Sequence, residues 1–358
     1  MHSLSSIETF STLGKFLRQF VENRRNDSNG MGLLNEKHHD PFRELIQKEH
    51  IYNPWFTEEY VIKAIEGIAG MLHPDVLTRW MEPYSGSLEH AAGPRTVGLV
   101  MAGNIPMVGF HDFMSVLITG HRVLAKPSSK DNRLIKSVAR VLADIDPAMG
   151  DRIRFTDEYL REVDAVIATG SDNTARYFDY YFRDRPHIIR RNRSGVAVLT
   201  GNESLEDLKS LGEDIFTFFG LGCRNVTKLY LPDSYDITTL MEALESFGYL
   251  YHHHKYGNNV DYYRTIFLMN RIRFFDNGVL LVKEDHNIAG PVGVVYYERY
   301  SDLGKLHHIL VSRSGEIQCC VSTDPDLRGA IPPGTSQKPL PWDYADGIDT
   351  IRFLTELN

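Results

Sequence analysis

Cysteine is scarce in this sequence. Only three cysteines occur in 358 residues, Cys223 and the adjacent pair Cys319 and Cys320. A small, odd number argues against a framework of disulfides and favours a reducing compartment. The sequence contains no Cys-x-x-Cys and no His and Cys spacing of the zinc type. We therefore expect no structural metal and no metal cofactor.

A basic surface and a long apolar run are also lacking. The formal net charge is −8, and the densest cationic cluster is Arg190-Arg-Asn-Arg193, so we expect no nucleic-acid partner. No segment approaches the roughly 18 apolar residues of a membrane helix. The first residues lack the basic and apolar regions of a signal peptide. These absences predict a cytoplasmic protein without a membrane span.

What is present is the composition of an ordinary globular protein, with 42% apolar and 24% charged residues. The length allows two domains with sizeable cores. Apolar residues recur at helical spacing over residues 6–23, 41–49 and 57–71, and the polar stretch 24–39 is predicted to be a loop. We therefore predict a helical N-terminal segment for residues 1–95.

Beyond this segment, strand and helix patterns alternate. The strand patterns lie at 97–101, 122–125, 163–168 and 196–200. Alternation of this kind builds a parallel sheet that is covered on both faces. The turns fall at the carboxyl ends of the strands, where such sheets bind ligands. We predict one α/β domain over residues 96–200.

A second α/β domain is predicted over residues 201–330, followed by a C-terminal tail over 331–358. Its central feature is Cys223, which follows Gly220-Leu-Gly222 and precedes a strand pattern at 226–231. A tight turn flanked by glycine lets a ligand approach the backbone and suits a nucleophilic thiol. The local sequence equally allows a small buried hydrophobic residue at this position.

Five segments together match the order of motifs in one family. They are Gly103-Asn-Ile-Pro106, Ala125-Lys-Pro-Ser128, Gly170-Ser171, Gly220-Leu-Gly-Cys223 and Asn287-Ile-Ala-Gly-Pro-Val292. From about Thr96 to Val295 the chain resembles the aldehyde dehydrogenase superfamily, and within it the acyl-CoA reductases such as the reductase subunit of bacterial bioluminescence. The resemblance implies an aldehyde-dehydrogenase-like α/β fold, with two Rossmann-like domains and the active site between them. Residues 96–200 would be the NAD(P)-binding domain and 201–330 the catalytic domain.

The resemblance also implies two catalytic residues. Cys223 would be the nucleophile, and Arg224 with free backbone amides would favour its thiolate. The side-chain amide of Asn104, together with the Cys223 N–H, would stabilise the oxyanion of a tetrahedral intermediate. Read locally, Asn104 is an ordinary turn-forming residue.

Four cofactor-binding residues follow in the same way. Lys126, beside Ser128, matches the lysine that holds the adenosine ribose. Gly170 and Ser171 match the turn that receives the pyrophosphate at a helix N-terminus. The local alternatives are a solvated lysine at a strand end and a plain serine N-cap.

Three departures from the family pattern refine this interpretation. The general base of the oxidative aldehyde dehydrogenases, a glutamate, falls at Ile189, so a thioester on the enzyme would not be hydrolysed quickly. The glutamate that often clamps the nicotinamide ribose falls at Asn287. Where NAD-specific members often carry glutamate, this chain has Ser129. The missing carboxylate would no longer repel a 2′-phosphate, with which Lys130 or Arg133 would pair.

We therefore expect NADPH-dependent reduction of a fatty acyl-CoA to the aldehyde and free CoA, through a thioester on Cys223. NADH is the alternative cofactor. The expected partners are the acyl-CoA, an acyl-activating enzyme and a second copy of the chain. Two other functions remain open, an acyl-phosphate reductase of the semialdehyde dehydrogenase type and a non-catalytic nucleotide-binding scaffold. Slow thioesterase or acyl-transferase activity would need no nicotinamide.

Overall fold

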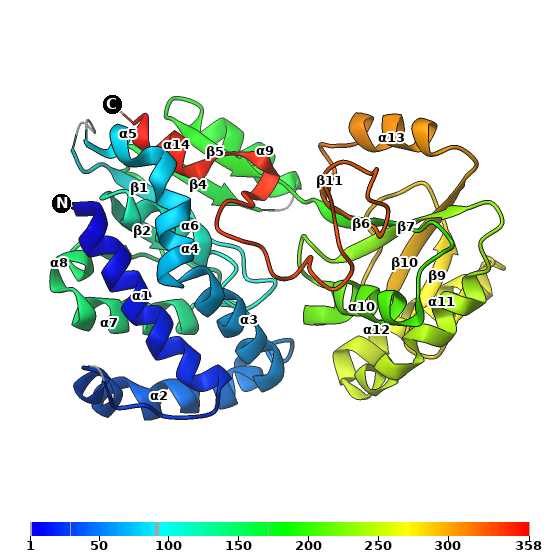
Figure 1. Ribbon diagram of the computed structural model, residues 1–358, viewed down its shortest axis with the longest axis horizontal. Helices are drawn as coiled ribbons and strands as arrows, with labels where there is room; N and C mark the ends of the chain where they lie inside the picture. The colour runs from blue at the N-terminus through cyan, green and yellow to red at the C-terminus, as the bar shows by residue number, and fades with distance from the viewer. Residues whose placement is uncertain (1, 29, 90–92, 171, 358) are drawn as a thin grey trace. The chain divides into compact units, whose positions relative to one another are not determined.

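The structure, a computed structural model, describes residues 2–28, 30–89, 93–170 and 172–357. The chain divides into two compact units (Figure 1). The first unit contains Met1–Arg191 with Pro339–Asn358, and the second contains Asn192–Lys338. Within the described ranges, no helix has the length and apolar character needed to cross a membrane.

The first unit is built on a parallel sheet with strand order β3-β2-β1-β4-β5. Its strands are β1 (Thr96–Val100), β2 (Arg122–Lys126), β3 (Ile153–Phe155), β4 (Ala165–Thr169) and β5 (His187–Arg190). The strand order reverses between β1 and β4. Ligands of open parallel sheets bind at the carboxyl ends of the strands beside such a reversal.

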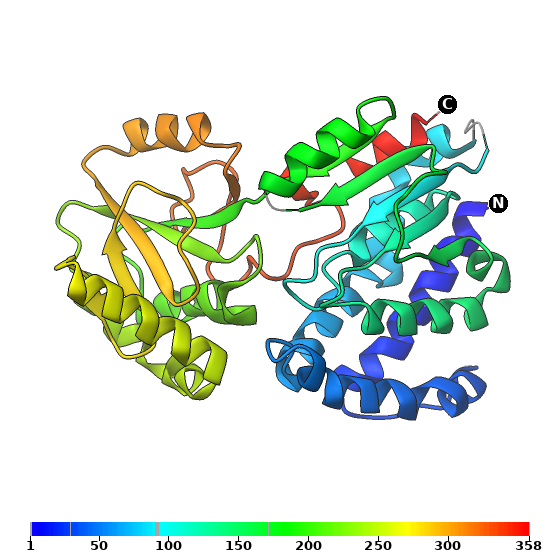
Figure 2. The same cartoon turned by 180° about the vertical axis from the view of Figure 1, so that it is seen from behind.

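Helices cover both faces of this sheet. The connections β1-α6-β2 and β2-α7-β3 lie with α1 on one face, and α9 lies across the other face (Figures 1 and 2). The helices of this unit are α1 (His2–Val21), α2 (Met31–Tyr52), α3 (Glu58–Met71), α4 (Pro74–Met81), α5 (Ser85–Glu89), α6 (Phe110–Ile118), α7 (Arg133–Ile145), α8 (Pro147–Gly150), α9 (Asp172–Phe182) and α14 (Thr350–Thr355), with 3₁₀ turns η1 (Glu82–Tyr84) and η4 (Ala345–Gly347).

The helical N-terminal segment packs on this unit, as the apolar spacing predicted. Phe10, Leu13 and Leu17 on α1 are completely buried, and Phe20 is nearly so. Each such side chain contributes about 2 kcal/mol by its removal from water. The stripe at helical spacing is therefore the core-facing side of α1.

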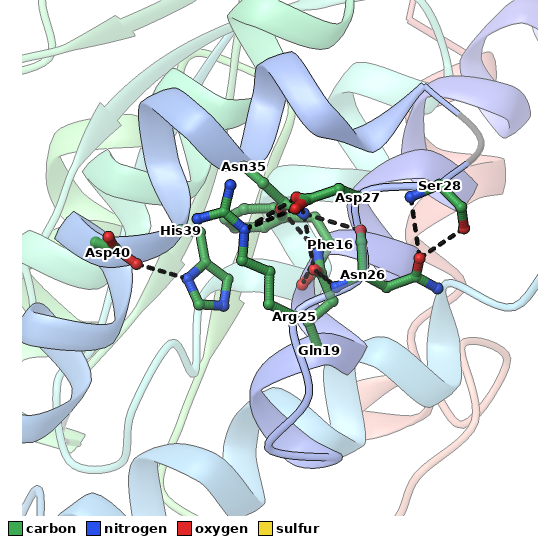
Figure 3. Close-up of polar contacts among 9 residues, drawn as sticks. All are labelled: Phe16, Gln19, Arg25, Asn26, Asp27, Ser28, Asn35, His39 and Asp40. Atoms are coloured by element: carbon green, nitrogen blue, oxygen red, sulfur yellow. Dashed lines mark hydrogen bonds and ion pairs between the residues drawn. The ribbon is translucent and has the colours of Figure 1, made fainter.

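The predicted loop over residues 24–39 is wrong in its second half, because α2 begins at Met31 and contains Pro41. The sequence analysis took Pro41 for a helix start, since proline interrupts helices. A buried polar network holds the first turns of α2 in place (Figure 3). In this network Asn35 Nδ2 donates to Gln19 Oε1, Asn26 O and Asp27 Oδ1, each at 2.9 Å. Contacts between α1 and α2, not local propensity, extend this helix.

The second unit contains a larger sheet, with strand order β12-β11-β6-β7-β10-β9-β8. All its pairs are parallel except β8 with β9. Its strands are β6 (Ser194–Val198), β7 (Val226–Pro232), β8 (Phe275–Asp276), β9 (Leu281–Glu284), β10 (Val294–Tyr300), β11 (Ile317–Val321) and β12 (Ala330–Ile331).

The strand predicted at 196–200 does not close the first sheet. As β6 it lies in the second sheet, between β11 and β7, and the units divide at residues 191 and 192 rather than at 200 and 201. All five residues of β6 are buried, and a Cβ on Gly195 would lie 2.6 Å from the Arg224 carbonyl oxygen. Chain order alone does not reveal which sheet a buried strand joins, because every such strand reads as an apolar run.

Helices cover this sheet too, with α13 on one face and α10, α11 and α12 on the other (Figures 1 and 2). The helices are α10 (Leu205–Phe216), α11 (Ile237–Ala243), α12 (His254–Met269) and α13 (Leu303–Ser312), with 3₁₀ segments η2 (Thr217–Gly220) and η3 (Leu244–His252).

The predicted C-terminal tail over 331–358 is shared between the units. Up to Lys338 it belongs to the second unit, where Asp214 accepts the backbone N–H groups of Gly334 and Ser336. The remainder folds onto the first unit, where Trp80 Nε1 donates to the Tyr344 hydroxyl at 2.8 Å. Buried side chains therefore fix this segment, and it ends in the helix α14.

Candidate active site

Cys223 lies in the turn between η2 and β7, where the sequence predicts it. The residue is half-buried, and it is not in a disulfide. The strand that follows, β7, lies in the middle of the second sheet. The turn is therefore attached to the most rigid part of this unit.

The buried side chain of Asn225 holds this turn in place. Its Oδ1 accepts the Gly222 N–H at 2.8 Å, and its Nδ2 donates to the carbonyl oxygens of Asp214, Ile215 and Thr217 at 2.9–3.3 Å. One amide thus satisfies four backbone groups of the segment that leads into Cys223, from the end of α10 to Gly222. The sequence analysis missed Asn225.

The approach to the turn is strained. Phe218 and Phe219 have φ of 54° and 57°, and Gly220 follows at 74°. Left-handed backbone is unfavourable for phenylalanine, so the surroundings must impose it. The Phe219 ring packs on His253 at a centroid distance of 4.2 Å, which helps to lock the turn.

The adjacent cysteines Cys319 and Cys320 lie in β11. Cys319 Sγ donates to the Arg224 carbonyl oxygen at 3.6 Å, so this thiol borders the Cys223 turn. Burial raises the pKa of Cys319 and of Cys320 to about 12. Both thiols therefore stay protonated near neutral pH and are poor nucleophiles.

Asn287 is exposed in the loop after β9. Its Nδ2 and its backbone N–H both donate to Asp285 Oδ1, at 2.9 and 3.0 Å. The Thr227 hydroxyl donates to the Ile288 carbonyl oxygen at 2.9 Å, which fixes the loop against the start of β7. The fully buried Lys228 ties the same loop down through the Asp285 carbonyl oxygen and forms an ion pair with Glu298 at 2.7 Å.

In the first unit, Asn104 lies in the loop that follows β1, and the residue is exposed. This loop packs against the one that follows β2. A Cβ on Gly103 would lie only 2.6 Å from Ser128 Cβ, so glycine is required there. The two predicted motifs, remote in sequence, therefore meet at the carboxyl edge of the sheet.

The remaining predicted cofactor residues lie at the same edge. Lys126 ends β2, and its Nζ donates to the Glu158 carbonyl oxygen at 3.2 Å. Ser129 is exposed beside the half-buried Ser128. Gly170 lies between β4 and the start of α9, whereas Ser171 lies outside the described residues. Ile189, where oxidative relatives place a base, is half-buried in β5.

A groove of about 570 Å³ between α2 and α7 is lined by several cationic side chains. Its lining includes Lys48, Arg133, Lys136 and Arg140. The Arg133 guanidinium lies 3.5 Å from the centre of the Tyr52 ring, so Arg133 faces α2. Lys130, the other residue considered for a 2′-phosphate, is exposed.

Asp131 is a second residue that the sequence analysis missed. Its side chain is only 4% exposed, and Oδ2 accepts the Met107 N–H at 2.6 Å. Burial raises its pKa to about 7, and the charge of Glu49 adds to this rise. A carboxyl group that titrates near neutrality therefore lies between the loops of Asn104 and Ser128.

The predicted residues thus fall into two groups. Asn104, Lys126, Ser128, Ser129 and Gly170 share the carboxyl edge of the first sheet, and Cys223 and Asn287 lie on loops that border β7 in the second. The two missed residues had weak signals in the sequence. Asn225 follows a Gly-x-Gly turn, where Asn commonly bonds the backbone, and Asp131 resembles an ordinary polar residue before a helix.

Several solved structures of aldehyde dehydrogenases have a similar fold. An indole-3-acetaldehyde dehydrogenase in complex with NAD⁺ matches 91% of this chain and 80% of its own, at 14% identity and a TM-score of 0.59. KauB from Pseudomonas aeruginosa matches 90% and 77%, at 14% identity and 0.59. The Mycobacterium tuberculosis aldehyde dehydrogenase complexed with NAD⁺ matches 84% and 70%, at 14% identity and 0.54. The predicted aldehyde-dehydrogenase-like fold is confirmed.

Sequence comparison then gives the family. The family model described as acyl-CoA reductase (LuxC) matches residues 37–246, more than half of the chain. A search of curated proteins finds no match. The chain belongs to the LuxC family of acyl-CoA reductases, which confirms the resemblance and extends it towards the N-terminus. Family and fold together indicate an oxidoreductase of aldehyde chemistry.

Replacing Asn225 with alanine removes the hydrogen bonds that hold the Cys223 turn and leaves the Gly222 N–H without its acceptor. We expect the free energy of unfolding to fall by about 3 kcal/mol. Urea unfolding measures this, and hydrogen exchange at Gly222 should accelerate. The control is Asn202→Ala at an exposed position, with an expected change below about 0.5 kcal/mol. Equal losses in the two variants would show that Asn225 does not hold the turn.

Asp131 should make the stability depend on pH. Its pKa is about 7 in the folded protein against an ordinary value of 3.8, so between these values the folded state holds a proton that the unfolded chain releases. The free energy of unfolding therefore falls as the pH rises from 4 to 7, by on the order of 4 kcal/mol from this group. Urea unfolding of Asp131→Asn should show the variant gaining on the wild type over this range. Asp151→Asn, at an exposed position, should keep a constant difference.

Proposed function

We propose that this protein reduces a fatty acyl-CoA to the aldehyde and free CoA with NADPH, through a thioester on Cys223. The observation that carries the proposal is the place of Cys223, on a tight turn before the central strand β7 whose Gly222 N–H is held by Asn225. The other two thiols lie in β11, where burial raises their pKa to about 12. Membership of an acyl-CoA reductase family supplies the substrate class.

The first step is transfer of the acyl group to the enzyme. The Cys223 thiolate forms a bond to the thioester carbonyl carbon, and the carbonyl electrons move onto oxygen. The Asn104 amide and the Cys223 N–H donate to this oxyanion. The carbon–sulfur bond to CoA then breaks, and CoA leaves as a thiolate that takes a proton from water. The product is a thioester on Cys223.

The second step is reduction of this thioester. The residues present fit a nicotinamide dinucleotide, because Lys126, Ser128 and Gly170 share the carboxyl edge of a parallel sheet beside its strand reversal. When bound, the reduced nicotinamide would supply a hydride to the carbonyl carbon of this thioester. The bond from that carbon to Cys223 Sγ then breaks, which releases the aldehyde and restores the Cys223 thiolate. Lys126 would hold the adenosine ribose, and Asn287 would contact the nicotinamide ribose. With Ile189 in place of a carboxylate, no side chain at this position activates water, so the thioester persists.

The preference for NADPH rests on charge. Ser129 adds no carboxylate to repel a 2′-phosphate, and the exposed Lys130 follows it directly. Cations also line the neighbouring groove, in a protein whose net charge is −8. NADH is the alternative, since several of the similar aldehyde dehydrogenases are complexes with NAD⁺.

The proposal also includes an acyl-activating enzyme as the source of the substrate, a cytoplasmic location, and self-association of the chain. These three points rest on the family resemblance and on the sequence composition.

Incubation with myristoyl-CoA should add one acyl group to the protein, seen by intact mass, and NADPH should release it as the aldehyde. In Cys223→Ala both the added mass and the aldehyde should be lost. The matched control is Cys319→Ser. It should still be acylated on Cys223, because the Cys319 thiol that it lacks stays protonated in the wild type and is a poor nucleophile. Aldehyde formation by Cys223→Ala would refute the thioester mechanism. Acylation by an acyl phosphate but by no CoA thioester would favour the semialdehyde dehydrogenase type.

Introducing a carboxylate at the proposed ribose site should change the choice of cofactor. In Ser129→Glu we expect KM for NADPH to rise about tenfold or more, the equivalent of ~1.4 kcal/mol, because the new charge repels the 2′-phosphate. KM for NADH should change less than twofold. Ser87→Glu, exposed in the same unit, controls for added charge. An equal rise for both cofactors would place the 2′-phosphate elsewhere.

A further inference from the structure

The loop that carries Asn104 is anchored at three points by the end of β2 and by the segment that follows it. At its start, the Met101 N–H donates to the Lys126 carbonyl oxygen at 3.1 Å. Near its middle, Gly103 packs against Ser128. At its end, the Met107 N–H donates to Asp131 Oδ2 at 2.6 Å. Asn104 therefore lies between the second and third anchors.

The third anchor differs from the other two, because it is a buried carboxyl group. Asp131 is 4% exposed, and its Oδ1 is buried without a hydrogen-bond partner among the described residues. Its backbone N–H donates to the Ser128 carbonyl oxygen at 3.0 Å, which fixes the residue on the segment that includes the second anchor. Burying a carboxyl oxygen without a hydrogen-bond partner costs free energy, so we ask what this carboxyl group contributes.

The backbone at this anchor is also strained. Met107 has a φ of 54°, a conformation that residues with a β-carbon rarely adopt. The Met107 carbonyl oxygen accepts the Phe110 N–H at 2.9 Å, so this residue is held both by Asp131 and by the start of α6. Removing Asp131 would release one of these two restraints, and the loop would relax away from its present path.

We propose that Asp131 is a positioning residue for Asn104: through the Met107 N–H it holds the Asn104 loop in the conformation that stabilises the oxyanion, and its carboxylate form holds the loop better than its protonated form. This inference rests on the proposed function, in which Asn104 donates to the oxyanion. Asp131 touches neither substrate nor cofactor in this role.

The charges around Asp131 support a protonation change near neutral pH. Burial raises its pKa to about 7, the Met107 N–H opposes this rise, and Glu49 on α2 increases it. Glu49 is itself buried, and the nearest cation, Arg133 on α7, lies 3.7 Å from its Oε2. Lys130, the adjacent residue, is exposed. No cation among these groups pairs with Asp131 directly, so its charge depends on the Met107 N–H.

The first test is a double-mutant cycle on acylation alone. The rate at which myristoyl-CoA acylates Cys223 is measured by rapid-quench intact mass, without any nicotinamide. Asn104→Ala should slow it about 10²- to 10³-fold, as the loss of an oxyanion donor does. Asp131→Ala should slow it about tenfold or more in the wild type, but less than twofold in the Asn104→Ala background, because Asp131 acts through Asn104. Losses that multiply would overturn the proposal.

The second test uses Asp131→Asn, which keeps an oxygen acceptor for the Met107 N–H but does not titrate. At pH 8 this variant should acylate about tenfold more slowly than the wild type, because a neutral amide, like the protonated carboxyl group, binds the Met107 N–H more weakly than the carboxylate does. The ratio of its rate to that of the wild type should rise about fivefold from pH 8 to pH 6. The ratio cancels any other pH dependence of the acylation step that both proteins share. A ratio that stays constant with pH would overturn the role of the carboxylate. Asp151→Asn is the control and should give a constant ratio.

A third measurement needs no activity, so that a failure of the proposed function can be told from a failure of this inference. Hydrogen exchange over the segment that contains Met107 should be faster in Asp131→Ala than in the wild type. Urea unfolding of the variant checks that it is still folded. An unchanged exchange rate would overturn the proposed anchor. If exchange accelerates but Asn104→Ala acylates normally, the anchor is established and the oxyanion role of Asn104 is wrong.

Discussion

A loop that leaves the end of a buried strand loses the hydrogen bonds of the sheet, and its backbone N–H and C=O groups need other partners. This constraint governs both parts of the candidate active site. In the second unit one buried amide, that of Asn225, bonds four backbone groups around Cys223. The strained Phe218 and Phe219 are then held by a rigid clamp rather than by local preference. A side chain on such a turn has little freedom to move.

The first unit meets the same constraint with a carboxyl group, and the choice has consequences. The amide of Asn225 is neutral at every accessible pH, so the Cys223 turn keeps its hydrogen bonds. Asp131 holds the Asn104 loop with a group whose pKa burial raises to about 7. Its hydrogen bond to Met107 is stronger when it is charged, although burial opposes that charge. We therefore expect the two loops to respond differently to pH, although each is fixed by one buried side chain of its own.

The strands β1, β2, β4 and β7 and the glycine turns beside them were predictable from sequence, since they depend on local periodicity and on glycine, whereas the short edge strands β3 and β5 were not predicted. Gly103 and Gly220 illustrate this, one through a close approach to Ser128 and the other through a φ of 74°. Asn225 and Asp131 were not predictable, because their importance comes from backbone atoms that are distant in sequence or belong to another loop. The predictions for the start of α2 and for the sheet that β6 joins were wrong for the same reason, because tertiary contacts decide both.

Selectivity among the three thiols follows from the same packing. Cys319 and Cys320 lie on β11, next to β6, where burial strongly disfavours a thiolate. Yet Cys319 donates to the Arg224 carbonyl oxygen, and so helps to hold the turn on which Cys223 lies. A protonated thiol suits that role, because a thiolate has no proton to donate. The burial that keeps Cys319 protonated therefore also preserves its hydrogen bond to the turn that carries Cys223.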